Sequence, residues 1–174
     1  MQENPKPPLP MRMHGIHSVF VVLIAGLLWA ADGGAQQTNA QTVALSFEEA
    51  AAHNIERETL DAEHRDAAHA DPDQAVFPAQ QDAVFEAWRT LFGALMSHLQ
   101  SADVVWNADT RGYFRVYAHP DGSIRHLLFT LHEGDLGEAD GFQETINEFA
   151  SEYNFGLETD EPYAQCGTIV LPAP

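Results

Sequence analysis

The hydrophobic positions between residues 81 and 101 recur with the spacing of an α-helix. They fall at i, i+1, i+4, i+7, i+8, i+11, i+12 and i+15, which is one wide helical face. Burial of each large side chain is worth about 1.5–3 kcal/mol, so this helix is expected to be the main support of the core. The stripe consists of Val84, Phe85, Trp88, Leu91, Phe92, Leu95, Met96 and Leu99.

The pattern then changes to the alternation of a β-strand. In residues 112–118 (GYFRVYA), Phe114 and Val116 share one face, and Tyr113 and Tyr117 share the other. The sequence His-Pro-Asp-Gly at 119–122 suits a turn, because proline presets the second position and glycine takes the left-handed one. Residues 123–131 continue as a second strand, so the segment predicts a β-hairpin.

Two further helices and one strand are predicted outside this segment. Ser46 and Glu49 form a capping box for a helix over 47–70, whose apolar stripe is thin and which ends at the Asp-Pro-Asp of 71–73. Asp140 and Gln143 cap a helix that starts at 142 and ends at Gly156. Residues 166–171 (CGTIVL) form the last strand.

The predicted order is α-α-β-β-α-β, which indicates an α+β fold. A small antiparallel sheet, made of the hairpin and the C-terminal strand, is expected to be covered by helices in two layers. The predicted organisation is a signal peptide (1–35), a flexible linker (36–45), an N-terminal helix and loop (46–79) and an α+β core domain (80–174). Residues 1–10, rich in proline and polar side chains, fit an overcalled start.

Residues 111–172 resemble the C-terminal domain of TonB-type proteins. The resemblance rests on the Phe114–Val116 strand, the Asp-Gly turn at 121–122, the strand over 124–131, the helix over 142–155 and the closing strand around Ile169. It covers about one-third of the chain and consists of the β-β-α-β order. The family's Tyr-Pro pair before the first strand and its Ser-Ser-Gly-like turn are missing. The resemblance therefore implies a fold and a cell-envelope location, and it carries over no functional residue.

The N-terminal segment has the layout of a secretory signal peptide. Arg12 precedes an uncharged run of 13 residues, 19–31 (VFVVLIAGLLWAA), and small residues follow, with a cleavage site expected after Ala35. A spanning helix needs about 20 apolar residues, so an uncleaved membrane anchor is the alternative. The chain is therefore expected to be exported, to the periplasm or the medium.

The charge of the chain is strongly acidic, with a formal net charge of −18. Removing Glu3 and Asp32 from the 26 acidic residues, and Lys6 and Arg12 from the 8 basic ones, leaves 24 acids and 6 arginines after Ala35. Such a surface repels nucleic acids and anionic membranes. Because the acids are spread along the chain, halophilic adaptation is favoured over an acidic patch for a cationic partner or metal.

Candidate metal ligands occur in two groups. His126, His132, Glu133 and Asp135 lie at the end of the second strand and in the acidic loop, and the carboxylates could hold calcium. His64, Asp66 and His69 lie on the first predicted helix, where a spacing of five turns the two histidines away from each other. Neither group has the spacing of an established metal motif, so solvated polar side chains are the simpler interpretation, and no cofactor is predicted.

Catalytic chemistry has little support in the sequence. Cys166, the only cysteine, opens a β-branched strand, where a small buried side chain is the simpler interpretation and an intermolecular disulfide the remaining one. Tyr113 and Tyr117 are candidate interaction residues if their face is exposed, and the alternative is that the first helix covers them. We therefore expect a non-enzymatic cell-envelope interaction module with a protein partner. A metal-binding protein, for calcium or a transition metal, and a small hydrolase are the alternatives.

Overall fold

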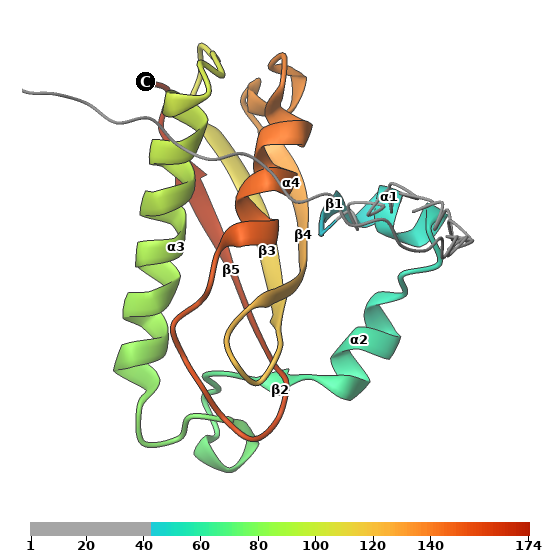
Figure 1. Cartoon of the computed structure of the whole chain (residues 1–174), viewed down its shortest axis with the longest axis vertical. Coiled ribbons are helices and arrows are strands. Elements are labelled where there is room, and N and C mark those ends of the chain that lie inside the picture. Colours follow the sequence, from blue (N-terminus) through green and yellow to red (C-terminus); the bar gives the residue numbers. More distant parts are fainter. Residues whose placement is uncertain (1–42) are drawn as a thin grey trace, which may run out of the picture. The chain divides into compact units, whose positions relative to one another are not determined.

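The computed structural model describes residues 43–174, and these fold around one mixed sheet of five strands in the order β1-β4-β3-β5-β2 (Figure 1). The predicted signal peptide and most of the linker lie outside the described residues. Within the described range four α-helices accompany the sheet, so the α+β class is confirmed. The strands are β1 (Ala44–Ser46), β2 (Arg65–Asp66), β3 (Thr110–Ala118), β4 (Ile124–Glu133) and β5 (Tyr163–Leu171), and the helices are α1 (Phe47–Ala52), α2 (Arg57–Glu63), α3 (Gln81–Ser101) and α4 (Phe142–Glu152).

The predicted hairpin is confirmed as β3 and β4, which pair antiparallel with Phe114 opposite Phe129 and Val116 opposite Leu127. Gly122 in the connecting turn has a φ of 82°, the left-handed conformation that the turn requires. The predicted C-terminal strand is also confirmed and starts earlier than expected. β5 runs antiparallel to the other side of β3, as predicted.

One face of the sheet packs against α3 and α4, which run side by side across it in Figure 1. α3 has the bounds that its periodicity predicted, and five residues of its stripe are buried. They meet Phe114, Val116, Leu127 and Phe129 from the sheet, so this face holds the main hydrophobic core. We call it the core face.

The segment before α3, residues 43–79, differs most from prediction, and we call it the arm. The capping box at Ser46 and Glu49 is present, but a continuous helix over 47–70 is wrong. The chain leaves the helical path at Asn54, whose φ of 59° is left-handed, and re-enters it as α2. The thin apolar stripe explains the break, because two short helices can each turn a few apolar side chains toward the sheet.

The arm also supplies both edge strands of the sheet. β1 pairs with β4 and β2 pairs with β5, each in parallel, so the expectation of a purely antiparallel sheet is wrong. Residues 43–174 all belong to one compact unit. The arm is therefore part of the sheet that the sequence assigned to residues 80–174 alone.

The start of α4 is also corrected. Gly141, in the left-handed conformation with a φ of 80°, occupies the N-cap position, and no side chain caps the helix there. The predicted cap, Asp140, lies one residue earlier. The helix ends at Glu152, before Gly156, which has a φ of 74°.

Candidate functional site

The two candidate tyrosines lie on the face of the sheet opposite the core face, and the arm covers one of them completely and the other in part. Tyr117 is fully buried and packs with Leu60 of α2 in a small apolar cluster. Tyr113 is half-buried and stacks on Phe47 of α1, with 6.0 Å between ring centroids. Tyr117 therefore cannot contact a partner while the arm is in place, and its predicted interaction role is corrected to a structural one.

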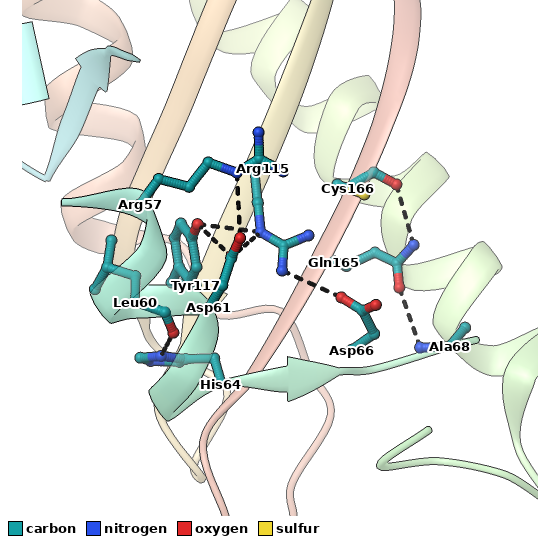
Figure 2. A network of polar contacts seen from close by, with 10 residues as sticks. All are labelled: Arg57, Leu60, Asp61, His64, Asp66, Ala68, Arg115, Tyr117, Gln165 and Cys166. Carbon is teal, nitrogen blue, oxygen red and sulfur yellow. Dashed lines mark hydrogen bonds and ion pairs between the residues drawn. The ribbon is translucent and has the colours of Figure 1, made fainter. Parts of the chain in front are cut away.

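Polar side chains join the arm to this second face around Arg115 of β3 (Figure 2). The Nε atom of Arg115 lies 2.7 Å from the Oδ1 atom of Asp61 in α2, and its Nη2 atom lies 3.2 Å from the Oδ1 atom of Asp66 in β2. The Tyr117 hydroxyl donates to Asp61 over 2.8 Å. We call these four residues, Arg115, Asp61, Asp66 and Tyr117, the Arg115 network.

In the Arg115 network the arginine is charged and the tyrosine is neutral. Burial by itself lowers the pKa of Arg115, but Tyr117, Asp61 and Asp66 outweigh it, and the pKa of Arg115 is raised. Burial, together with donation to Asp61, raises the pKa of the Tyr117 hydroxyl. The guanidinium thus stays charged and the phenol stays protonated near neutral pH, and both hold α2 and β2 to the sheet.

An open cleft of about 610 Å³ lies beside this network, between α2, β2 and the loop that follows. Its charges are balanced, because three arginines and three aspartates line it and most of these are already paired with one another. No serine, threonine or cysteine is among its lining residues. They are Arg57, Asp61, His64, Arg65, Asp66, His69, Asp73, Gln74 and Arg115.

The predicted metal ligands are separated from one another. His126 is buried on β4, whereas His132 and Glu133 are exposed at the end of that strand. Asp135 accepts hydrogen bonds from the backbone N–H groups of Asn107 and Ala108, which lower its pKa. Within residues 43–174 no three His, Cys, Asp or Glu side chains come together in a way that could hold a metal ion.

The three members of the second histidine group all line the open cleft, but they do not converge on a metal site within residues 43–174. His64 ends α2, where it is buried. Asp66 binds Arg115, and the Nδ1 atom of His69 accepts from the backbone N–H of Asp71. Cys166, a free thiol, is half-buried on β5, opposite Arg115 of β3.

The outer edge of β5 is the feature of this fold that the sequence did not reveal. β2 pairs only with Tyr163 and Ala164, so β5 extends seven residues beyond its partner's register. The carbonyl of Ala164 accepts from Ala67, and the carbonyl of Cys166 accepts from the side chain of Gln165, which also receives the Ala68 N–H. The Gln165 side-chain amide thus provides the last hydrogen bonds of this ladder, beyond the end of β2.

The alternating direction of the backbone groups along β5 identifies which N–H and C=O groups on the outer edge remain without a strand partner. Because Ala164 and Cys166 direct their carbonyls to the outer edge, Thr168 and Val170 direct their N–H and C=O groups the same way. Both residues lie opposite β3 on the inner side, and no strand among residues 43–174 pairs with either of them on the outer side. Both residues are exposed, Val170 at 50 %.

An apolar groove of about 280 Å³ runs along the same edge, between α3 and β5. Trp88 packs over Gly167, where an added Cβ would lie 3.2 Å from the indole Nε1 atom. Glycine thus lets the indole lie close against the strand, where a larger residue would make a tight contact. The groove is lined by Trp88, Arg89, Phe92, Gly93, Met96, Ile169, Val170 and Leu171.

Comparison with known proteins adds no relative. No family model matches the chain, and searches of curated proteins and of solved structures gave no significant match. Within residues 43–174 no helix combines the length and apolar character that crossing a membrane requires.

Proposed function

We propose that this chain is a non-enzymatic interaction module that binds an extended segment of a partner protein along the outer edge of β5. The observation that carries the proposal is the strand edge itself. Thr168 and Val170 present backbone donors and acceptors without a strand partner in the described part of the chain, beside an apolar groove. Strand addition uses these two elements together, since the backbone supplies affinity and the groove selects side chains.

The chemistry of the groove indicates the kind of segment that would fit. Side chains alternate across a strand, so every second residue of an added strand would face Trp88, Phe92 and Met96 and should be apolar. The net charge of −18 favours a partner with basic residues near that segment, because unlike charges speed encounter. Natural edge strands are usually covered or charged, and Thr168 and Val170 carry no charge.

Export is part of the same proposal. It is supported by the basic, apolar and small-residue order over 12–35 and would place the partner in the cell envelope or outside the cell. Mass spectrometry of the purified native protein should find an N-terminus close to residue 36. An intact N-terminus in the cytoplasmic fraction would contradict export without affecting the strand edge.

Photo-crosslinking tests the binding edge directly. The full chain carries benzoylphenylalanine at Val170 in its native host, and a matched chain carries it at Val105, which is 67 % exposed but lies outside the groove. We expect a discrete adduct from position 170 and none from 105. Equal adducts at both positions, or none at 170, would contradict the proposal.

A proline substitution adds the backbone test. Thr168→Pro removes an outward N–H and leaves the β3 ladder intact, because proline is tolerated where the N–H faces away from the sheet. The adduct should disappear in Thr168→Pro and persist in Thr168→Ala, which keeps the N–H. An adduct that survives the proline would show that the partner does not pair with the strand.

A further inference from the structure

Two buried histidines lie beneath α2, and neither is used by the proposed binding edge. His64 is 2 % exposed, and its ring meets Tyr117 edge-on with 5.3 Å between centroids. Its Nδ1 atom lies 2.8 Å from the carbonyl oxygen of Leu60, so Nδ1 must carry the proton and donate. The Nε2 atom is then an unprotonated acceptor, and it is buried with no hydrogen-bond partner among the described residues.

His126 lies on the same face of the sheet, opposite Tyr117 in the register of β3 and β4. It is 6 % exposed, and its Nδ1 atom is also buried with no partner in residues 43–174. A cavity of about 190 Å³ separates it from α2, with Leu60 and Glu63 on the helix side. Both imidazoles are therefore buried on the side of the sheet that the arm covers.

The charges around both rings disfavour a second proton. Arg125 of β4 acts on both histidines, and a charge on His64 also disfavours one on His126. Glu63 is the nearest compensating carboxylate, but it is already paired with Arg125 over 2.8 Å. On the sheet side and at the start of α2 the pair also faces His119 in the hairpin turn, Tyr117 on β3 and Glu56. On the side of the open cleft, His64 shares the lining with three arginines, three aspartates and His69, which are Arg57, Arg65, Arg115, Asp61, Asp66, Asp73 and His69.

We propose that the arm is an acid-responsive cover, in which protonation of His64 and His126 releases α2 and β2 from the sheet and exposes the apolar surface beneath them. That surface comprises Tyr117, Leu128 and Ala164, which Leu60 now covers. A protonated imidazole without a hydrogen-bond acceptor is costly in this site, and exposure to water removes the cost. The Arg115 network holds the arm closed only while the free-energy cost of burying protonated imidazoles is smaller than the stabilisation that the network provides.

The direction of the pH dependence follows from burial. Burial lowers the pKa of both histidines, that of His126 to about 4. The released arm restores ordinary values near 6.5, so it binds more protons between about pH 6.5 and 4. The closed arm is therefore fully stabilised above about pH 6.5 and loses stability as the pH falls. By pH 5 the closing equilibrium should shift by about thirtyfold from His126 alone.

Hydrogen exchange of the full chain at pH 7.5 and 5.0, corrected for intrinsic rates, tests the cover. We expect amides of residues 57–66 to lose at least tenfold protection at pH 5.0, while those of α3 change little. The double variant His64→Gln/His126→Gln has no titrating ring at either position and should keep its protection at both pH values. His53→Gln, which removes an exposed histidine, should behave like the parent chain.

Three results would overturn the proposal. They are unchanged protection of residues 57–66 in the parent chain, an equal loss in α3, and a loss in the double variant as large as in the parent. If the double variant does not fold, NMR titration of the parent chain decides the matter. His64 and His126 must then titrate below the ordinary histidine pKa of about 6.5, and titration at or above that value would refute the cover.

Discussion

The two faces of the central sheet are covered in different ways. On the core face, Phe114, Val116 and Leu127 meet the apolar stripe of α3, and none of these contacts involves a charge. On the second face, Tyr117 and Leu128 meet the few apolar side chains that the arm supplies, Leu45, Ala50 and Leu60. Buried Arg115, His64 and His126 occupy the rest.

The difference shows how a short helix can be held on a sheet. A helix of seven residues such as α2 buries too little apolar surface to stay docked by burial alone. The second face therefore relies on ion pairs and hydrogen bonds, whose strength depends on protonation. Apolar contacts do not depend on protonation. The stability of the core face should therefore be sensitive to changes in side-chain volume, and that of the second face to changes in charge.

Truncation of a core phenylalanine should give the largest effect. Phe114 is fully buried, with ring centroids 5.0 Å from Phe92 and 6.0 Å from Phe129. We expect Phe114→Ala to lower the free energy of unfolding by about 3–5 kcal/mol, because the cavity cannot be filled by its neighbours. Urea unfolding followed by tryptophan fluorescence measures this loss.

The matched change on the second face is Leu60→Ala. Leu60 is 4 % exposed but belongs to a cluster of only six buried residues. Its loss should lower stability by about 2 kcal/mol and increase exchange in residues 57–66 before the rest of the chain. A larger loss in the free energy of unfolding for Leu60→Ala than for Phe114→Ala would contradict the expectation that the core face contributes more to stability than the second face.

Removal of the buried guanidinium should rank next. Arg115→Met keeps most of the side-chain volume but leaves Asp61 and Asp66 without their cation. Both carboxylates are about one-third exposed, so the cost is that of a partly screened pair, about 2 kcal/mol. Guanidinium chloride would screen the charges, so urea is the denaturant of choice.

Arg115→Lys provides the control for that change. An ammonium retains the charge but cannot reproduce the fork that reaches Asp61 and Asp66 together. We expect an intermediate loss, with the exchange of α2 and β2 increased and that of α3 unchanged. If Arg115→Met leaves the exchange of residues 57–66 unaltered, the network does not hold the arm.

Sequence patterns predicted the core face well because its signals are long and local. The stripe of α3 runs from Val84 to Leu99 within a helix of 21 residues, and the alternation of β3 fixes which side chains point inward. The turn at Gly122 fixes the pairing of β3 with β4. These elements form where their own residues predict them.

The second face could not be predicted in the same way. β1 and β2 have only three and two residues, too few for a period, and they exist because longer strands pair with them. Asp61 is 54 positions before Arg115, and no local pattern links two such residues. Asn54 was the available signal for the break in the arm, because asparagine tolerates the left-handed conformation.

The candidate site was predictable only in part. Alternation placed Tyr113 and Tyr117 together on the face opposite the core, but their exposure depended on where the arm lies. The open edge of β5 depends on the length of β2, which the sequence did not show. The edge therefore emerges from tertiary structure, although each of its side chains could be assigned to a face in advance.

The smallest effect is expected at the opposite edge of the sheet, which β1 forms. There, side chains of α4 bind backbone groups, whereas the outer edge of β5 is left open. The Oδ1 atom of Asn147 accepts from the N–H groups of Val43 and Ala44, over 2.6 and 3.1 Å, and Gln143 donates to the carbonyl of Ala44 over 2.8 Å. A helix of the core face thus fixes the start of the arm. Asn147→Ala should leave two backbone donors unpaired.

That loss should cost about 1 kcal/mol, because the site is half-buried and water can replace part of the interaction. Asn147→Asp keeps the acceptor oxygens and should cost less, although it adds a charge. Exchange should increase at Leu127, whose N–H donates to the carbonyl of Val43, and remain unchanged in β5. Increased exchange in β5 as well would mean that the two edges are coupled through the sheet, and the arm would then be held as one unit and not at separate points.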